Sequence, residues 1–291
     1  MSGLAMLLVG LMFYASAWSQ GAASAPGSEP ERWEWTGKVG QGQAIRVENA
    51  YGDVRARFGG YDGEVEIHAV IQNIHPGAPP LKVSPQMGPT GMTIRVVRDS
   101  TAPGTRTDPT VSPSGGRENK ADRVDLVVRI PKGSALTAVT RAGAVGVKGL
   151  KGDVMAQSES GAISVREVAG LVQTRNSYGP TSVILGPLPG KTTQTFESLT
   201  GDISITLPPR ADAAVRAETS GWITTDVSVS IVHHPREEPD KVATAKVGSG
   251  ASSVSIKTKR GNVQILQMTD LRDLLVSPEK EKPAPPGPED D

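Results

Sequence analysis

Apolar and polar residues alternate in short runs along most of the chain, and these runs recur at a fixed distance. The stretch GAVGVKGLKGDVMAQSES, residues 143–160, is followed at once by GAISVREVAGLVQTRNSY, residues 161–178, with its apolar and glycine positions in the same places. Alternation at every second residue puts those side chains on one face of a β-strand. The pattern therefore predicts many short strands, two in each repeat of eighteen residues.

The aligned positions define a unit of apolar-x-apolar, four residues, glycine, x, apolar-x-apolar. In the two stretches above, Val145 aligns with Ile163 and Val147 aligns with Val165. A fixed period near twenty residues is typical of a solenoid, whose coils stack and bury one continuous core. We therefore expect an all-β fold, a β-solenoid of two-strand coils of about 18–22 residues each, over residues 33–267.

A glycine precedes the second strand of each unit, where the chain turns. We expect these glycines to be needed because positive φ costs glycine nothing. The structural turn glycines are Gly52, Gly143, Gly161, Gly179, Gly201, Gly221 and Gly261. Short polar residues stand three positions before six of them, at Asn49, Thr140, Ser158, Asn176, Ser198 and Thr258. We interpret these side chains as hydrogen-bonding partners of the stacked turns rather than as a catalytic column.

Other segments flank or interrupt the regular units. Extra strands are expected on the N-terminal side at residues 64–72, 92–98 and 123–130, where they would extend or cap the solenoid. Residues 268–276 carry leucines at helical spacing and predict a short helix that covers the last open coil. Residues 75–91 and the polar excursion 233–240 are expected to be irregular.

Three segments have compositions that cannot bury a core. The loop at residues 99–120 and the tail at residues 277–291 are rich in Pro and polar residues, so both are expected to be disordered. Residues 20–32 are expected to form a flexible N-terminus of the mature chain. The core-forming part is thereby limited to residues 33–267.

The first nineteen residues contain an apolar run, LAMLLVGLMFYASAW, which is short for a membrane span of about 20 residues. Small residues follow the run, so residues 1–19 are interpreted as a secretory signal peptide cleaved before Gln20. The segment lacks a basic start, and an uncleaved N-terminal anchor is the alternative. We therefore expect an exported protein of the periplasm, cell surface or medium, with membrane contact, if any, only through an uncleaved N-terminus.

Composition narrows the possible functions. The chain of 291 residues has 33 glycines and equal numbers of basic and acidic residues, so its formal net charge is zero. A nucleic-acid partner requires a basic footprint, and the sequence shows none. The absence of cysteine excludes disulfides, thiolate metal sites and a cysteine nucleophile.

Four stretches resemble a bacterial putative-adhesin family of β-strand-repeat proteins, a domain of otherwise unknown function. They are IRVENAYGDVRARFGG, DLVVRIPKGSALTAVTRAGAVGVKGLKGDV, QSESGAISVREVAG and VGSGASSVSIKTKRGNVQIL. The resemblance covers residues 33–267 and rests on the Ile-Pro-Lys-Gly step before the repeats and on the successive turns. It implies a β-solenoid, export and no known catalytic residues.

Candidate catalytic and metal-binding patterns are weak. His233 and His234 lie in a polar stretch without ligand spacing, and the Gly-Asp pairs lack the glycine-rich nonapeptide of calcium-binding rolls. Cleavage of a glycoside needs two carboxylates about 5–9.5 Å apart. The expected outward columns contain none; they comprise Arg55, Gly146, Ser164, Ser182, Ser204, Thr224 and Gln264 on one strand, and Arg46, Thr137, Met155 and Gln173 on the other. We therefore predict no catalytic residue, no metal and no cofactor.

The tryptophans offer one candidate for ligand contact. Trp33 and Trp35 alternate before the first strand and are expected to close an end of the core, whereas Trp222 occupies an outward position after a turn glycine and could stack on a sugar. The leading hypothesis is an exported, non-enzymatic envelope or surface scaffold with a possible adhesive role. The alternative is a parallel β-helix that binds or cleaves polysaccharide. The expected partner is a component of the cell envelope or surface, either protein or glycan.

Overall fold

The computed structural model describes residues 30–60, 62–74, 78–99 and 122–269, and these residues form strands joined by turns and loops. They contain 21 strands in two mixed sheets. No helix occurs in these ranges, so no described segment is a helix that could cross a membrane. The prediction of an all-β protein is confirmed.

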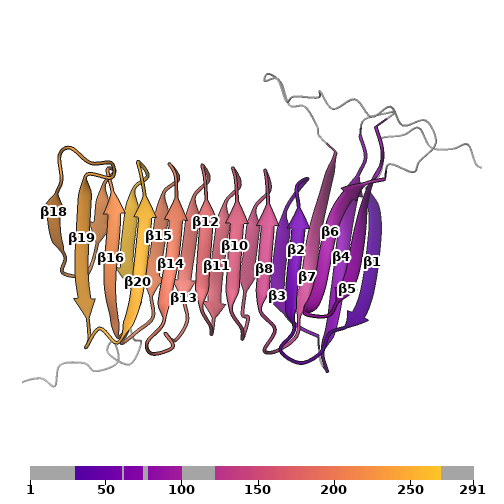
Figure 1. Ribbon diagram of the computed structural model, residues 1–291, viewed down its shortest axis with the longest axis horizontal. Helices are drawn as coiled ribbons and strands as arrows, with labels where there is room; N and C mark the ends of the chain where they lie inside the picture. Colours follow the sequence, from indigo (N-terminus) through magenta and orange to yellow (C-terminus); the bar gives the residue numbers. More distant parts are fainter. Residues whose placement is uncertain (1–29, 61, 75–77, 100–121, 270–291) are drawn as a thin grey trace, which may run out of the picture.

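The two sheets divide the strands almost equally. Sheet A has ten strands, in the order β1 (Glu31–Lys38), β4 (Glu64–Gln72), β7 (Arg123–Ile130), β3 (Val54–Phe58), β9 (Val145–Lys148), β11 (Ile163–Val168), β13 (Thr181–Leu185), β15 (Ile203–Leu207), β21 (Val263–Gln267), β17 (Ile223–Thr225). Sheet B has eleven, in the order β18 (Ser230–His233), β19 (Lys241–Val247), β16 (Ala213–Thr219), β20 (Ser252–Thr258), β14 (Thr193–Ser198), β12 (Val172–Asn176), β10 (Val154–Ser158), β8 (Leu136–Thr140), β2 (Ala44–Asn49), β6 (Gly91–Arg98), β5 (Leu81–Gly88). Figure 1 shows these strands side by side along the long axis of the molecule.

Consecutive strands from β8 to β15 alternate between the two sheets, and each strand from β8 to β13 pairs in parallel with the strand two places further along the chain. The register is the one that the repeat predicts, because Val145 pairs with Ile163 and Val147 pairs with Val165. Parallel pairing at this offset places equivalent residues of successive repeats about 4.8 Å apart. The positions that recur in the pattern are therefore those that touch their counterparts in the neighbouring repeat.

The core lies between the two sheets. Inward residues of both sheets are buried, including Leu150 and Val168, the extra apolar residues at or just after the end of the second strand of a unit. Phe196 in β14 is fully buried. It lies between Gly179 and Gly201, which are further apart in the sequence than the other consecutive turn glycines from Gly143 to Gly221. Burial of one Val, Ile or Leu side chain contributes roughly 1.5–3 kcal/mol, so the aligned apolar positions stabilise the stack collectively.

The units do not follow one another in simple chain order at the C-terminal side. Strand β20 lies between β14 and β16, and β21 lies between β15 and β17, all in parallel pairs. The last two strands of the chain are thus inserted inside the stack. The end of the stack is formed instead by β16 to β19, where β19 pairs antiparallel with both β16 and β18.

This insertion bears on the helix expected at residues 268–276. Met268 and Thr269 are not helical, and residues 270–276 lie outside the described ranges. The physical reason for expecting a helix was an open last coil, and that condition is absent because β21 has a strand on each side. No capping helix is seen in the described part of the chain.

The extra N-terminal strands expected at residues 64–72, 92–98 and 123–130 are present as β4, β6 and β7. Strand β7 extends sheet A next to β3, and β6 extends sheet B next to β2. The expectation that residues 75–91 are irregular is wrong, because β5 forms a hairpin with β6. Strand β1 was not predicted, because Trp33 and Trp35 were expected to precede the first strand; they lie within β1, which pairs antiparallel with β4.

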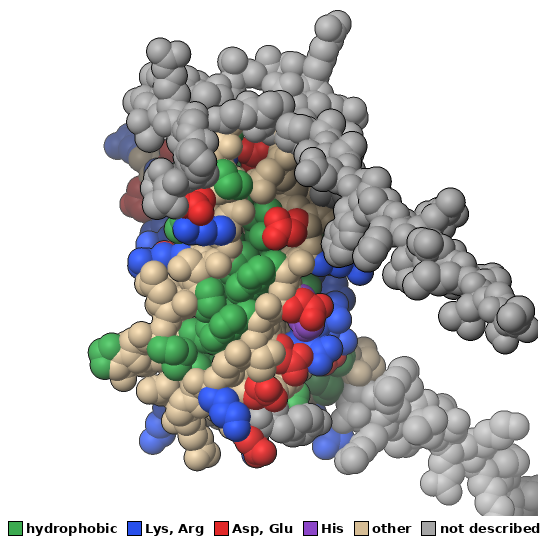
Figure 2. Space-filling model, turned by 90° about the vertical axis from the view of Figure 1, so that its right-hand side faces the viewer, with side chains coloured by type: hydrophobic (Ala, Val, Ile, Leu, Met, Phe, Trp, Pro, Cys, Tyr) green, Lys and Arg blue, Asp and Glu red, His purple; other side chains and the backbone are tan. Residues whose placement is uncertain are grey.

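Two tryptophans help to close this end of the core. Trp33 and Trp35 on β1 are partly buried and pack against the core residues, which confirms the capping interpretation. Figure 2 looks onto this end and shows hydrophobic side chains gathered in the middle, with charged side chains towards the margins.

Several expectations concern residues outside the described ranges. They are the signal peptide at 1–19, residues 20–29, the loop residues 100–120, and the tail at 277–291. These remain predictions from the sequence.

Candidate functional site

The turn glycines form a single column along one edge of the stack. A Cβ atom on Gly161 would lie 1.9 Å from the carbonyl oxygen of Gly143, and one on Gly179 would lie 2.2 Å from that of Gly161. The same close approach occurs at Gly52, Gly143, Gly201, Gly221 and Gly261. None of these seven has positive φ, so the conformational reason given for them was wrong. They are glycines because the backbone of the neighbouring unit leaves no room for a side chain.

The polar residues three positions before the turn glycines hold this column together. Ser158 Oγ donates to the carbonyl oxygen of Gly143 at 3.1 Å and accepts from the backbone N–H of Gly161 at 2.9 Å. Thr140, Asn176 and Thr258 make the same pair of bonds in their own units. The hydroxyl and amide groups of this column are therefore bonded to backbone, and the structural interpretation is confirmed for them.

The acidic residues after turn glycines also bond to backbone. Asp53 Oδ1 accepts from the N–H of Ala144 at 2.8 Å, and Asp202 Oδ1 accepts from the N–H of Asn262 at 2.7 Å. Within the described ranges, no three His, Cys, Asp or Glu side chains come together in a way that could hold a metal ion. The Gly-Asp pairs act as links between adjacent repeats.

Trp222, the ligand candidate from the sequence, lies in the turn before β17 near the far end of the stack. Its side chain is 80% exposed, and its backbone N–H donates to Asn262 Oδ1 at 2.9 Å. Lys241 Nζ lies 5.9 Å from the centre of the indole ring, close enough for a cation–π contact. The ring is thus oriented by its neighbours and is open to solvent, as stacking on a sugar requires.

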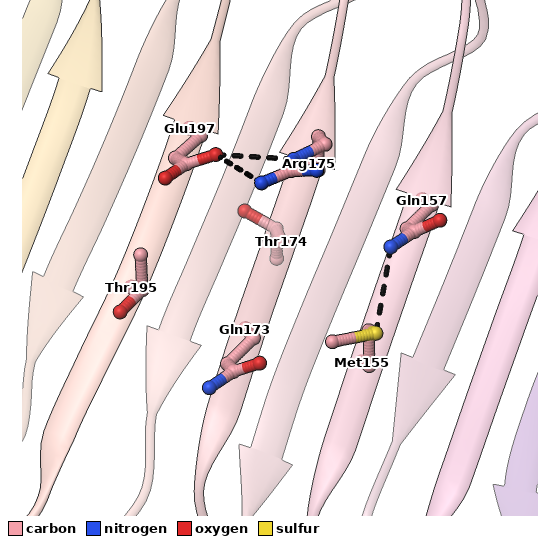
Figure 3. A pocket seen from close by; sticks show the side chains of 7 residues that line it. All are labelled: Met155, Gln157, Gln173, Thr174, Arg175, Thr195 and Glu197. Atoms are coloured by element: carbon pink, nitrogen blue, oxygen red, sulfur yellow. Dashed lines mark hydrogen bonds and ion pairs between the residues drawn. The ribbon is translucent and has the colours of Figure 1, made fainter.

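A hollow on the outer face of sheet B is a second candidate, and the sequence did not predict it. It has a volume of about 240 Å³ and lies over β10, β12 and β14 (Figure 3). Its lining consists of Met155, Gln157, Gln173, Thr174, Arg175, Thr195 and Glu197. Drug-sized ligands usually occupy pockets of about 300–1,000 Å³, so this hollow is better suited to part of a larger ligand.

Charge in this hollow is neutralised internally. Arg175 donates to Glu197 Oε2 from Nε at 3.1 Å and from a terminal nitrogen at 2.9 Å (Figure 3). Gln157 lies beside Arg175 in the register, and its Nε2 is 3.4 Å from Met155 Sδ. One ion-paired carboxylate among neutral side chains can bind polar groups, but it does not provide a free acid and base.

The hollow belongs to a longer row of outward residues on sheet B, which we call the polar row. In strand order it contains Arg95, Glu48, Val139, Gln157, Arg175, Glu197, Lys257 and Glu218. The outward columns expected from the sequence lie two residues earlier on each strand, so they do not include this row with its three glutamates. The signal was available, because every second residue of a strand faces the same way.

The glutamates of the polar row are all ion-paired. Arg46 donates to Glu48 and holds the pKa of Glu48 below its ordinary value, with Arg95 also bonded to it at 2.8 Å. Burial raises the pKa of Glu218, but hydrogen bonds from Lys257 and Arg216 outweigh that effect and the pKa is lowered. The general acid of a glycosidase needs a raised pKa, so these groups are poorly placed for that reaction.

Comparisons with known proteins do not assign the chain to a family. Neither a protein family nor a curated protein matches the chain. Among solved structures, it is similar to a putative cell adhesion protein from Clostridium sporogenes ATCC 15579, with 10% identity, a TM-score of 0.39, and coverage of 82% of this chain and 100% of the other. A putative adhesin from Bacteroides fragilis NCTC 9343 gives 10% identity, a TM-score of 0.32, and coverage of 82% and 97%. At such low TM-scores we draw no conclusion about function from either.

Proposed function

We propose that the protein is an exported, non-catalytic β-solenoid that serves as a scaffold of the cell envelope or surface, with outer faces suited to adhesion. The observation that carries this proposal is the register of the parallel strands, in which Ile163 lies over Val145 and under Thr181. Buried positions and turn glycines are fixed by this stacking, while outward positions are free to vary. Such a fold supplies long flat surfaces without requiring an enclosed pocket.

A non-catalytic role is supported by the state of the polar side chains. The serine and threonine hydroxyls of the turn column are bonded to backbone, and the glutamates of the polar row are bonded to arginine or lysine. Catalysis by paired carboxylates needs one group that can give a proton and one that can take it. On the outer face of sheet B, the carboxylates of the polar row are held in ion pairs instead.

Export is supported only by the sequence. The apolar segment at residues 1–19, followed by small residues, has the form of a signal peptide, and the resemblance to the putative-adhesin family also implies export.

Binding of polysaccharide is the second candidate, and the exposure of Trp222 favours it. An indole ring that is 80% exposed and anchored through its backbone is a suitable surface for stacking on a sugar. This role is compatible with a scaffold and differs from it in requiring measurable affinity for a glycan.

Cell fractionation of the native host, combined with intact-mass measurement, tests the proposal. We expect to find the protein in the envelope or medium, with the mass of a chain that begins at Gln20. A cytosolic protein that retains residues 1–19 would contradict export. The purified protein should release no reducing ends from acidic or neutral polysaccharides, and steady release that is lost in Glu197→Gln or Glu218→Gln would contradict the non-catalytic role.

A further inference from the structure

Four basic side chains lie in one line across the outer face of sheet A. Arg129 on β7 pairs with Arg57 on β3, Arg57 pairs with Lys148 on β9, and Lys148 pairs with Arg166 on β11. All four are exposed, and we call them the cationic row. Neighbouring strands are about 4.8 Å apart, so the row is about 14 Å long.

Three of these charges have no acidic partner in the part of the chain that the structure describes. Arg129 contacts Glu66 Oε2 at 3.1 Å, whereas no described carboxylate lies within 4.0 Å of the charged nitrogens of Arg57, Lys148 or Arg166. Like charges directly opposite each other destabilise a sheet. The row therefore costs stability, and nothing among the described residues offsets that cost for its last three members.

Sheet B of the same molecule arranges its outward charges differently. In its polar row Arg95 lies opposite Glu48, and Arg175 lies opposite Glu197. Lys257 lies between Glu197 and Glu218 in the register. Opposite charges alternate there and attract each other. The contrast indicates that the cationic row is directed at something outside the chain, which must be negatively charged.

Small residues lie beside the second half of the cationic row and continue past its end. The next outward row of sheet A carries Val127 and Arg55 beside Arg129 and Arg57, and then Gly146, Ser164, Ser182 and Ser204 on the following strands. The small residues leave the surface there low, and the serine hydroxyl groups can exchange hydrogen bonds with a polyhydroxylated ligand. A flat cationic line with a hydroxyl-bearing margin matches a linear chain that carries both carboxylates and hydroxyl groups.

Nucleic acid is the other polyanion to consider, and the surface fits it less well. Proteins that bind single strands combine a basic groove with aromatic side chains on which successive bases stack. Neither of the two outward rows just described contains an aromatic residue on β7, β3, β9, β11, β13 or β15. Phe58, which follows Arg57 on β3, is 42% exposed, and Lys151 Nζ lies 5.8 Å from the centre of its ring. One ring at the end of a strand does not form a series on which successive bases could stack.

We propose that the cationic row binds a linear acidic polysaccharide, with its carboxylates on Arg57, Lys148 and Arg166 and its hydroxyl groups towards Ser164 and the serines of the following strands. Arginine forms two parallel hydrogen bonds with a carboxylate, which adds geometry to the charge attraction. This inference rests on the proposed surface role and names the ligand chemistry that the role would use. The sequence hides the surface because its four cations come from segments up to 109 residues apart, from Arg57 to Arg166, and the net charge of the chain is zero.

The test measures binding of the full mature chain to immobilised polygalacturonate at several salt concentrations. The variant Arg57→Gln/Lys148→Gln/Arg166→Gln should lose at least about tenfold in affinity. Its affinity should also depend less on salt, because its binding releases fewer counterions from the polyanion. A matched control, Arg236→Gln/Lys246→Gln/Lys259→Gln, removes the same charge from exposed positions outside the row and should bind within about twofold of the unmodified protein. Equal losses in both variants would show that only net charge matters and would overturn the proposal.

Three further readouts separate the explanations. The thermal midpoint of the first variant should stay the same or rise, since mutual repulsion is removed, so unfolding cannot explain its loss of binding. Equal binding to a neutral polysaccharide, or tighter binding to a single-stranded oligonucleotide, would overturn the choice of ligand. A protein that fractionates with the envelope but does not bind polygalacturonate would refute this inference and leave the proposed scaffold role standing.

Discussion

At the scale of single residues, close approach of backbones explains more of the sequence than backbone conformation does. The turn glycines carry no side chain because the carbonyl oxygen of the preceding unit occupies the space where a Cβ atom would lie. The polar residue three positions earlier bonds to both glycine backbones. Two residues per unit therefore fix the distance between neighbouring units at this edge.

Alanine substitution of a turn glycine tests this explanation. Gly161→Ala places a methyl group 1.9 Å from the carbonyl oxygen of Gly143, so the two units must separate locally. We expect a loss of at least about 2 kcal/mol in the free energy of unfolding, measured with urea. Gly190→Ala is the matched control, because no atom lies within 4 Å of the place its methyl group would take and its φ is not positive. Equal unfolding midpoints for the two variants would show that close approach is not the constraint.

Asp212 gives a residue-scale prediction about pH. Its Oδ1 accepts from the backbone N–H of Ala251 at 3.1 Å and of Gly250 at 2.5 Å, and Ser249 Oγ donates to both carboxylate oxygens. These bonds, of which that from Ala251 is the largest influence, lower the pKa of Asp212. A lowered pKa in the folded state gives stability that is present above the ordinary aspartate pKa of about 3.9 and is lost as the pH falls through the folded value.

We therefore expect Asp212→Asn to unfold more easily than the unmodified protein at neutral pH, and the difference to disappear in acid. Denaturant unfolding between pH 2 and pH 7 measures it. The control Glu237→Gln alters an exposed acid with no ion pair to described residues and should leave the profile unchanged. A constant difference between Asp212→Asn and the unmodified protein at every pH would contradict the assignment.

At the scale of elements, the alternation of apolar residues predicted the strands of the repeated units, their inward faces and their register, but not β1, β18 or β19. It succeeded where one repeat rests on the next, as Val165 does on Val147. It could not predict that β20 enters the stack beside β14, because any two units with matching apolar positions can pair equally well. It also missed β5, since Pro85 and the glycines that flank the segment are typical of a loop, yet Pro is tolerated at a sheet edge.

The candidate surfaces were less predictable than the strands for a related reason. Trp222 was found because one exposed aromatic after a turn is visible in the sequence. The cationic row and the polar row depend on which strands are neighbours, so their charges become adjacent only after the register is known. Pairs such as Arg57 with Lys148 have no signal in a single strand.

A pair of adjacent substitutions tests the assignment of faces within one strand. Val165 on β11 is fully buried, whereas Ser164 faces outward between Gly146 and Ser182. Val165→Asp buries a charge without a partner and should cost more than about 4 kcal/mol, enough to prevent folding of many domains. Ser164→Asp should change the unfolding free energy by less than about 1 kcal/mol. Circular dichroism and urea unfolding compare the two, and similar destabilisation would refute the assignment.

At the scale of the whole molecule, the stack is completed only by the end of the chain. Parallel strands occupy the middle of both sheets, and antiparallel strands occupy both ends of sheet B and the N-terminal end of sheet A. Strand β20 separates β14 from β16, and β21 separates β15 from β17. The unit of β14 and β15 and the unit of β16 and β17 are therefore not neighbours in either sheet. The terminal cap formed by β16 to β19 is therefore attached to the rest of the stack through the last strands.

Truncation at two points tests this dependence. A chain that ends at Gly250 lacks β20 and β21, so β14 and β15 lose one parallel neighbour each and β17 loses its sole strand partner among the described residues. We expect this chain to lose the fold of residues 213–247, with proteolysis there at low protease concentration, because unpaired sheet edges and an exposed core face remain. A chain that ends at Thr269 retains all the described strands and should unfold at the same urea concentration as the full chain. A synthetic peptide of residues 248–269 added to the shorter chain should restore protease resistance, since it supplies both missing strands. Resistance of the shorter chain without the peptide would show that β16 to β19 can dock directly on β14 and β15, and that the insertion is not required for the cap.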